Sequence, residues 1–480
     1  MSWSTAERGT APLAGSSETA VAVGKRQRAF VYAFAGVMAA VFSAASTADY
    51  HLYLAGRLDL GNMVQVVWST AHGHLLRMSD PNGVGMSRLG AHFDPFLALL
   101  APLWWVWSSP IVLLAAQAVA VASGALPVYW LARKHLASGG FAVVFAVAYL
   151  LYPPTQFNES TPIGLHAVSF AIPLLLYAIW FLDNDRLIPF GVFAVLASTT
   201  KEEIAAAVGG LGLWYAIRRG KRIGWAICAL GLAISIVNLT VVIPHFAPGA
   251  TQPFVDRYSD VGGSPQGIAR MLFTDPQAFG EQVASWHKLA YLALVFLPFL
   301  GLWAREPIML AGAVPDLVIN MLSSKPEQTS IFYQYTAGMI PFVVAASILG
   351  AARLRRRRHA PTALLAAVGC LAAASPLVFT ITHAHWWTHK QIVARQQALD
   401  LIPPRAAVSA SNSLGAYVST RRSVAMFPNL GRASWVVVGP TTTGADDPPV
   451  FNHAVRQLKA DRRWRLVLRS EDILVFKRRA

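Results

Sequence analysis

Apolar runs separated by short polar or basic segments fill the chain between residues 29 and 382. A helix needs about 20 mostly apolar residues to cross a bilayer, and most of these runs approach that length. The pattern predicts about eleven membrane helices, at roughly 29–48, 110–132, 139–152, 167–182, 187–200, 203–217, 223–243, 288–304, 306–322, 332–352 and 361–382. We therefore expect an all-α polytopic membrane protein.

One further apolar stretch is too short to cross. "DPFLALLAPLWWVW", residues 94–107, holds about a dozen apolar positions, which suits an interfacial or re-entrant helix. If it crossed, every later loop would change sides, and the arginine cluster at 353–358 would lie outside the cell. Because cytosolic loops carry the excess of Lys and Arg, we expect this stretch not to cross.

Composition and charge agree with this class. The chain is 55% hydrophobic and 13% charged, whereas soluble domains carry about 25% charged residues. The net charge of +16 comes from basic blocks between apolar runs, a pattern that sets membrane topology and argues against a nucleic-acid partner. If the N-terminus is cytosolic, every block faces the cytosol: Lys25 with Arg26 and Arg28, Arg133 with Lys134, Arg186, 218–222, Arg305 and 353–358.

The two ends of the chain differ from its apolar middle. Residues 1–28 are expected to form a disordered cytosolic tail, because they are rich in Ser, Ala, Gly and Thr. Residues 29–382 form the predicted transmembrane domain, with outer loops at 49–109 and 244–287. Residues 383–480 carry short strand patterns and one helix pattern, "HAVRQLKADRR", which predict a small extracytoplasmic α/β domain.

This topology places most histidines and acidic residues outside, beginning with Asp59 in "GRLDLGNMVQVVW". Asp59 followed by Gly61 and Asn62 is typical of a helix N-cap. A carboxylate at the membrane surface, in a partly apolar pocket, could instead serve as a general base. The residues by themselves leave both roles open.

The same outer loop ends with His92 and Asp94 in "LGAHFDPFLALL". Asp94 before Pro95 predicts an N-cap with proline at the first helical position. His92 has no capping duty and is a candidate for binding an anionic headgroup or phosphate, the alternative being a structural histidine.

A second outer loop, "YPPTQFNESTPIGLHAVSF", carries Glu159 and His166. Its prolines break a helix at the membrane surface. His166, at the entrance of the next helix, could bind a phosphate or orient a carboxylate. The alternative is a loop that merely turns the chain.

Lys201, Glu202 and Glu203 stand between two apolar segments with no proper loop. Each charge near hydrocarbon costs roughly 2.5–3.5 kcal/mol, so these side chains must face a cavity or one another. Lys201 could hold a phosphate, with the glutamates orienting it or binding a metal. An ion pair that locks two helices is the alternative.

Tyr333 and Tyr335, close to Lys325 and Glu327, could be interfacial belt residues or could stack on a sugar. Cys228 and Cys370 lie in apolar runs, so neither a disulfide nor a cysteine metal site is expected. The sequence has no P-loop, dinucleotide fingerprint, zinc HExxH motif or nucleophile elbow. Their absence argues against a nucleotide-driven pump or a serine hydrolase.

Several of these segments together resemble a known family. "RLDLGNMVQVVWSTAHGH", "YLLYPPTQFNES", "TTKEEIAAAVGGLGLW" and "VPDLVINMLSSKPEQTSIFYQYTAGMIPFV" are similar, in order, to the predicted membrane proteins of domain of unknown function 2079. The resemblance covers about 50–480. That family in turn is similar to the GT-C class of membrane glycosyltransferases, so we expect a GT-C-like fold.

The resemblance implies a polyprenyl-phosphate sugar donor and a cell-envelope glycan or lipid acceptor outside the membrane. It also implies a catalytic carboxylate in the first outer loop, which falls on Asp59. No cofactor is required beyond an optional divalent cation. The expected substrate-binding residues are His92, Asp94, Glu159, His166, Lys201, Glu202 and Tyr333.

One segment departs from the family pattern. This chain has "GLHAVSF", with Ala167 and Val168 after His166, where the family has an acidic residue in an "FHPE"-like motif. The departure argues against a metal or base role in this loop.

Two other functions compete with the transferase: an envelope lipid or glycan transporter or flippase, and a non-catalytic membrane scaffold. Transporters tend to show internal repeats. The sequence shows none, and its large outer loops and outer domain favour an enzyme.

Overall fold

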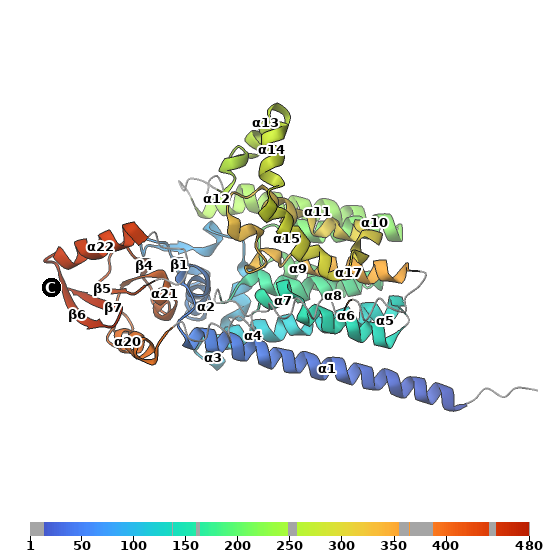
Figure 1. Ribbon diagram of the computed structural model, residues 1–480, viewed down its shortest axis with the longest axis horizontal. Helices are drawn as coiled ribbons and strands as arrows, with labels where there is room; N and C mark the ends of the chain where they lie inside the picture. Colours follow the sequence, from blue (N-terminus) through green and yellow to red (C-terminus); the bar gives the residue numbers. More distant parts are fainter. Residues whose placement is uncertain are drawn as a thin grey trace, which may run out of the picture.

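The computed structural model describes residues 14–136, 138–159, 164–247, 257–354, 364, 387–440 and 448–479. Almost all of the predicted last span, 361–382, lies outside these residues, as does Cys370. The described chain forms a bundle of helices with a small sheet domain at one end of its long axis (Figure 1). Two short helices, α13 (Pro265–Thr274) and α14 (Pro276–Val283), project from one side of the bundle.

The bundle is built from α-helices that vary widely in length. They are α1 (Ala14–His51), α4 (Pro110–Ser123), α5 (Ala125–Leu136), α6 (Gly139–Leu151), α7 (Pro153–Phe157), α8 (Ala171–Asp183), α9 (Leu187–Ser198), α10 (Ile204–Arg219), α11 (Ile223–Val237), α12 (Ile243–Phe246), α15 (Trp286–Phe296), α16 (Val314–Leu322) and α17 (Ile340–Ala352). At its centre lies α17, in which every residue from Ile340 to Ala351 is buried. A helix that is apolar all round is typical of a protein core or of a membrane span, and α17 lies in the core.

The expected number of membrane spans is not confirmed. In the described part of the chain, three helical stretches are long and apolar enough to cross a bilayer: Gly24–His51, Pro110–Leu136 and Ile223–Phe246. Other apolar helices have 10–17 residues. The predicted span at 306–322 is interrupted, because a 3-10 turn (Pro307–Gly312) precedes α16. Proline removes a backbone donor and restricts the chain, which accounts for such breaks.

The predicted disordered tail is wrong for residues 14–28, because α1 begins at Ala14. Residues 14–22, "AGSSETAVA", contain Ala and Glu, which favour helix, and they continue a helix already formed by the apolar run. Residues 1–13 lie outside the described part.

The short apolar stretch at 95–106 folds as a 3-10 helix (Pro95–Leu100) followed by α3 (Ala101–Val106). Its twelve residues are too few to cross a bilayer. Trp105 and Trp107 at its end are exposed, as expected for aromatic side chains at a membrane surface. Which side of the membrane it occupies stays a prediction.

The described residues of the basic blocks gather at the end of the bundle opposite the sheet domain (Figure 1). Buried Asp183 accepts hydrogen bonds from Lys134 and His135. Buried Glu306 pairs with Arg218 and also with Arg353. Blocks that are far apart in the sequence therefore share one end, which is the arrangement that the charge rule requires.

The C-terminal domain is a five-stranded sheet in the order β4-β3-β5-β7-β6. β3 pairs with β4 and β5 in parallel, while β7 pairs with β5 and β6 in antiparallel fashion. The strands are β3 (Val408–Ala410), β4 (Val424–Met426), β5 (Trp435–Val438), β6 (Trp464–Ser470) and β7 (Ile473–Arg478). The α/β character predicted for this region is therefore confirmed, whereas the domain boundary near 383 lies outside the described residues.

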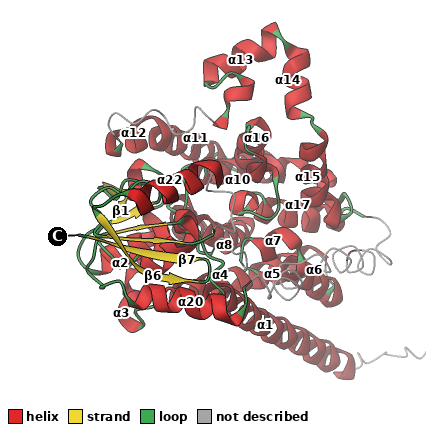
Figure 2. Cartoon of the chain, turned by 60° about the vertical axis from the view of Figure 1, so that its left-hand side comes forward, coloured by secondary structure: helices red, strands yellow, loops and turns green. Residues whose placement is uncertain are grey.

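Two helices cover opposite faces of this sheet (Figure 2). α20 (His389–Asp400) packs on the face of Val437 and Val475. α22 (Pro448–Ala460) packs on the face of Val436 and Phe476. Alternation along each strand explains why neighbouring residues serve different helices.

α10 and α11 pack unusually closely because glycines line their contact. A Cβ atom placed on Gly231 would collide with the backbone of Ala205 and Gly209. Small residues of this kind let membrane helices approach backbone to backbone.

We expect Gly231→Leu to destabilise the protein by on the order of 2 kcal/mol, because the added side chain overpacks this contact. Gly191→Leu is the matched control, since nothing lies within 4 Å of a Cβ at Gly191. Thermal unfolding of the detergent-solubilised chain measures both. Equal melting temperatures for the two variants would contradict the close packing.

Candidate active site

Charged side chains from three distant segments meet where the helical bundle joins the C-terminal domain. The backbone N–H of Phe93 donates to Glu202 Oε2 at 3.1 Å, and that of Phe96 donates to the Thr199 carbonyl at 3.0 Å. His166 Nε2 lies 3.7 Å from Asp59 Oδ1. The first predicted outer loop is thereby joined both to the 164–170 segment and to the turn before α10.

Asp59 lies within a π-helical turn (Arg57–Gly61) that runs directly into α2 (Asn62–Ala71). No side chain caps either helix, so the alternative role of Asp59 as an N-cap is wrong. The chain is already helical before Asn62, and its first backbone donors therefore have partners within the turn. Single π turns of this kind often occur at functional sites.

The Asp59 carboxylate is surrounded by protein but still reaches water, with 32% of its side chain exposed. Burial raises the pKa of Asp59 to about 7, although the positive charge of Arg88 opposes this shift. Tyr333 and Tyr335 lie within electrostatic reach of the same carboxylate. Near neutral pH this group can therefore both accept and release a proton.

Arg88 and Asp94 form a buried, two-pronged ion pair. Arg88 Nε donates to both carboxylate oxygens at 3.0 and 2.9 Å, and Nη2 donates to Oδ2 at 2.6 Å. Asp94 is the N-cap residue of the following 3-10 helix, with proline in its first turn, as predicted, but its side chain accepts no capping hydrogen bond. The carboxylate of Asp94 binds the Arg88 guanidinium instead of a backbone N–H of the helix, because a charged bidentate pair is stronger than a hydrogen bond from a neutral backbone N–H. The sequence reasoning missed Arg88.

His92 and Glu202 join the first outer loop to the α9–α10 turn. His92 Nδ1 lies 3.0 Å from Glu202 Oε1. Burial alone would raise the pKa of Glu202, but His92 and Lys201 outweigh it and lower the pKa to about 2. Glu202 is therefore ionised and holds the loop, rather than remaining free to orient a ligand.

Lys201, the residue before Glu202, forms an ion pair with Glu203. Its ammonium group also lies 5.6 Å from the centre of the Tyr335 ring. Burial by itself lowers its pKa, but the surrounding carboxylates, above all Glu203 and Asp316, raise it above the usual value. Lys201 is thus a permanent cation at the site.

Asp316, in α16, was not singled out from the sequence. One of its oxygens accepts the backbone N–H of Gly338 at 2.9 Å, and the other has no hydrogen-bond partner among the described residues. A lone carboxylate within the apolar "VPDLVINML" was the signal that could have identified it, because an isolated charge in such a segment is costly.

His166 is neutral at this site. Burial, together with the positive charges of Arg88 and Lys201, lowers its pKa to about 3. Its backbone N–H donates to Gln117 Oε1 at 2.9 Å, which fixes the segment before α8. A neutral imidazole facing Asp59 can exchange a hydrogen bond with it but adds no charge.

Glu159 does not join Asp59. It lies beside Ser46, whose hydroxyl donates to the Glu159 carbonyl at 3.0 Å. Neither carboxylate oxygen has a hydrogen-bond partner within the described part of the chain. Burial raises the pKa of Glu159 well above its usual value, so this side chain is a neutral acid, and its predicted role in substrate binding stays untested.

The described residues contain no group of three or more His, Cys, Asp or Glu side chains suited to a metal ion. Arg88, His92 and Lys201 each engage one of the carboxylates. This arrangement fits an anionic ligand better than a divalent cation, because Arg88 and Lys201 both lie within electrostatic reach of His166, the neighbour of Asp59.

The C-terminal domain holds the Asp59 turn in place. Arg57 is fully buried and donates to the carbonyls of Ser79 and Val424 at 3.1 and 2.7 Å. The backbone N–H of Leu58 donates to Asn412 Oδ1 at 3.1 Å. A Cβ on Gly61 would press against Ser419 and Ala416. These contacts fix the residues on both sides of Asp59.

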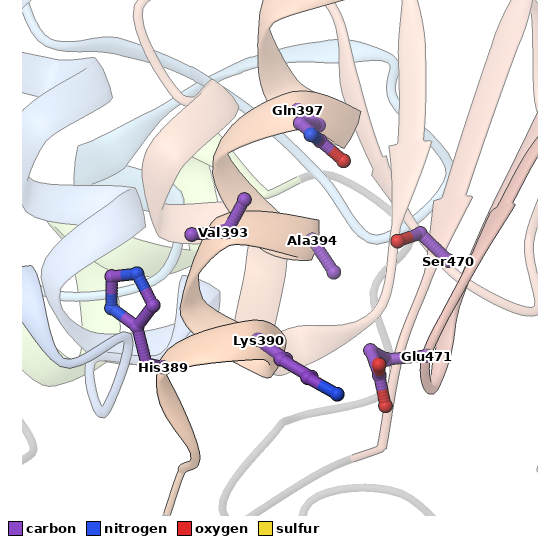
Figure 3. Close-up of a pocket in the computed structure, with 7 residues that line it drawn as sticks. All are labelled: His389, Lys390, Val393, Ala394, Gln397, Ser470 and Glu471. Atoms are coloured by element: carbon purple, nitrogen blue, oxygen red, sulfur yellow. The ribbon is translucent and has the colours of Figure 1, made fainter.

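A separate hollow of about 350 Å³ lies on the C-terminal domain, between α20 and the β6–β7 turn (Figure 3). His389, Lys390 and Gln397 line it from the helix, and Ser470 and Glu471 line it from the turn. Its polar side chains are largely exposed, and Lys390 and Glu471 carry opposite charges. It contains none of the residues that surround Asp59.

The chain is similar to a known protein family and to solved structures. Residues 50–466 match a family model described as "Predicted membrane protein (DUF2079)". No curated protein matches the sequence. The structure of ArnT from Cupriavidus metallidurans bound to undecaprenyl phosphate is similar at 13% identity, with a TM-score of 0.52 and coverage of 91% of this chain and 97% of that chain.

The apo structure of the same ArnT gives a TM-score of 0.53 at 13% identity and the same coverage. An oligosaccharyltransferase from Archaeoglobus fulgidus, crystallised with Zn and sulfate, matches at a TM-score of 0.42, 13% identity and coverage of 83% of this chain and 68% of that chain. The ArnT likeness extends over nearly the whole of both chains and shows a shared GT-C fold.

The hydrogen bond from Leu58 to Asn412 gives a direct test of how the Asp59 turn is held. Asn412→Ala removes the acceptor, and we expect the Leu58 amide to exchange with deuterium about fivefold faster, the effect of one lost hydrogen bond. Asn429→Ala, an exposed position in the same domain, should leave that exchange unchanged. An unaltered Leu58 amide in the first variant would contradict the positioning role.

Proposed function

Since this chain belongs to the DUF2079 family of predicted membrane proteins and shares its fold with ArnT, we propose that it is a membrane glycosyltransferase. It transfers a sugar from a polyprenyl-phosphate donor to a cell-envelope glycan or lipid. ArnT was crystallised with undecaprenyl phosphate, which supports a lipid-linked donor here. Membrane lipid and the acceptor are the partners, and nucleic acid is not.

One observation carries the proposal: a partly exposed carboxylate with a pKa near 7 lies within electrostatic reach of Arg88 and next to His166, which both Arg88 and Lys201 reach. Asp59 has the proton affinity of a general base at neutral pH. Arg88 lies within electrostatic reach of Asp59, and Lys201 lies within electrostatic reach of the adjoining His166. Sugar transfer from a lipid phosphate needs both features, because a hydroxyl must lose a proton while a phosphate leaves as an anion.

The proposed reaction is a single displacement. Asp59 takes the proton of an acceptor hydroxyl as its oxygen forms a bond to the anomeric carbon of the donor. The bond between that carbon and the phosphate oxygen breaks, and the electron pair leaves with the polyprenyl phosphate. Lys201 stabilises the leaving phosphate, and neutral His166 orients the Asp59 carboxylate across the 3.7 Å that separates them.

The other residues at the site have supporting roles in this proposal. His92 and Asp94 act through their partners Glu202 and Arg88, by holding the loop that carries Asp59. Tyr333, half-buried near Asp59, offers an aromatic face to the sugar. Glu159 and any divalent cation have no assigned step.

The proposed reaction takes place on the outer side of the membrane. The basic blocks gather at the opposite end of the bundle, and basic blocks mark the cytosolic side. A nucleotide-sugar made in the cytosol does not reach the outer side, so a lipid-linked donor is physically required.

Replacing the proposed base should stop transfer. In a deletion strain, we expect Asp59→Asn to fail to restore the sugar that the wild-type chain restores, because loss of a general base costs about a hundredfold or more in rate. Asp400→Asn, an exposed carboxylate on the C-terminal domain, is the matched control and should restore it.

The measurement is a mass-spectrometric profile of envelope glycolipids at equal levels of membrane-inserted protein. A missing sugar in the deletion strain is the expected result. An accumulated inner-leaflet precursor would indicate a flippase, and an unchanged profile would indicate a scaffold. Full restoration by Asp59→Asn would sink the assignment of Asp59 as base.

Transfer should also depend on pH in a defined way. The reactive form of Asp59 is the carboxylate, so the rate should fall about tenfold per pH unit below its pKa of about 7. His166→Gln and His92→Gln should keep this acid limb, because the titrating group is Asp59. Transfer in isolated membranes between pH 5 and 8 measures it, and a limb near pH 4, or its loss in either histidine variant, would contradict the assignment.

A further inference from the structure

A second, smaller cavity lies in the seam between α2 and the C-terminal domain. Its volume is about 180 Å³. Gln65, Trp68 and Ser69 line it from one side of α2, where residues three and four apart share a face. Arg77 lines it from the first strand of a small hairpin, β1 (Arg77–Ser79) with β2 (Gly85–Ser87).

The remaining wall comes from the C-terminal domain, through Arg421 and Arg422. The wall is tied together by hydrogen bonds across the seam. Gln65 Nε2 donates to the Arg421 carbonyl at 2.8 Å and to Ser79 Oγ at 2.9 Å. Gln65 and Arg421, which are more than 300 residues apart in the sequence, are therefore held together in the wall of one cavity.

The lining of this cavity is strongly positive. It contains three arginines and His74, and no acidic residue. Within the described part of the chain, none of these three guanidinium groups takes part in an ion pair. Arg77 donates only a long hydrogen bond, of 3.4 Å, to the Gly85 carbonyl among the bonds seen there.

Arg421 is the most informative of the three, because it is only 8% exposed. Its terminal nitrogens donate to the carbonyls of Val418, Ile402 and Pro403 at 3.1, 3.2 and 3.4 Å. Its Nε has no hydrogen-bond partner among the described residues. A buried cation without a counter-ion is costly, and an anion in the adjoining cavity would offset that cost.

The shape and chemistry of the cavity specify the anion further. Arginine donors suit the paired oxygens of a carboxylate or phosphate. Trp68 is half-exposed at the wall, and an aromatic face of this kind stacks on apolar faces of ligands while its surroundings remain wet. The volume has room for one sugar ring with its acidic group.

We propose that this cavity binds an acidic sugar residue of an envelope glycan. The site lies on the face of α2 formed by Gln65, Trp68 and Ser69 and contains none of the residues assigned to transfer. It thus goes beyond the proposed reaction: binding here does not need Asp59 to act as a base.

Calorimetry on the purified full-length chain in detergent tests this directly, with a hyaluronan tetrasaccharide as the acidic probe. We expect saturable binding that weakens as salt is raised, because the contact is between charges. Maltotetraose, a neutral saccharide of equal length, should not bind measurably. Inorganic phosphate should bind more weakly than the acidic tetrasaccharide, because it lacks the ring that contacts Trp68.

Variants localise the binding. Arg77→Gln and Arg422→Gln should each weaken binding of the tetrasaccharide about tenfold, the usual effect of losing one charge-assisted hydrogen bond. Both side chains are exposed, so folding should not depend on them. Arg465→Gln removes an equal charge from an exposed position on β6, outside the cavity lining, and should bind as the wild type does.

Asp59→Asn should also keep full binding, which separates this proposal from the transferase proposal. Three results would overturn the inference. They are equal binding of maltotetraose, binding of phosphate as tight as that of the tetrasaccharide, and loss of binding in Arg465→Gln as large as that in Arg77→Gln and Arg422→Gln.

Discussion

Charged side chains are buried next to the apolar helices of this protein, and the need to pair them determines how its segments pack together. Each charge removed from water must find a partner, and the partners lie on segments that are distant in the sequence. His92 reaches Glu202 across more than 100 residues, and Lys201 lies between Glu203 and Asp316. These contacts draw the first loop, which carries Asp59 and Arg88, onto the turn before α10.

The same constraint makes the C-terminal domain part of the site. Buried Arg57 needs several acceptors, and it finds them in the carbonyls of Ser79, Asp80 and Val424. One side chain therefore joins the Asp59 turn, the hairpin and the sheet domain. If the domain were absent, these acceptors and the Asn412 contact would be lost, and the turn would have no fixed geometry.

α2 separates two environments of different character. Asp59, in the π-helical turn just before α2, lies within electrostatic reach of Arg88, whose charge is balanced by Asp94, as suits a site where charge changes during a reaction. Gln65, Trp68 and Ser69 line a cavity with arginines that form no ion pair within the described chain, as suits binding of a ligand that brings its own negative charge. The proposed functions of transferring a sugar and holding an acidic glycan thus use the turn before α2 and one side of α2.

The sequence alone determined the class of the protein, the C-terminal α/β domain and most of the residues around Asp59. Apolar runs, basic blocks and strand patterns are local signals, and each reports on its own segment. Lys201 and Glu202 could be identified for the same reason, since charge between two apolar segments is costly wherever it lies.

Only the tertiary structure decided which charges meet. Asp59 and Asp94 both resemble helix caps in sequence, but Asp59 lies inside a π-helical turn and Asp94 is taken by Arg88. Glu159 is buried, and its carboxylate oxygens have no hydrogen-bond partner among the described residues. The partner of a buried charge can lie hundreds of residues away in the sequence. No local pattern of hydrophobic and polar residues predicts such a contact.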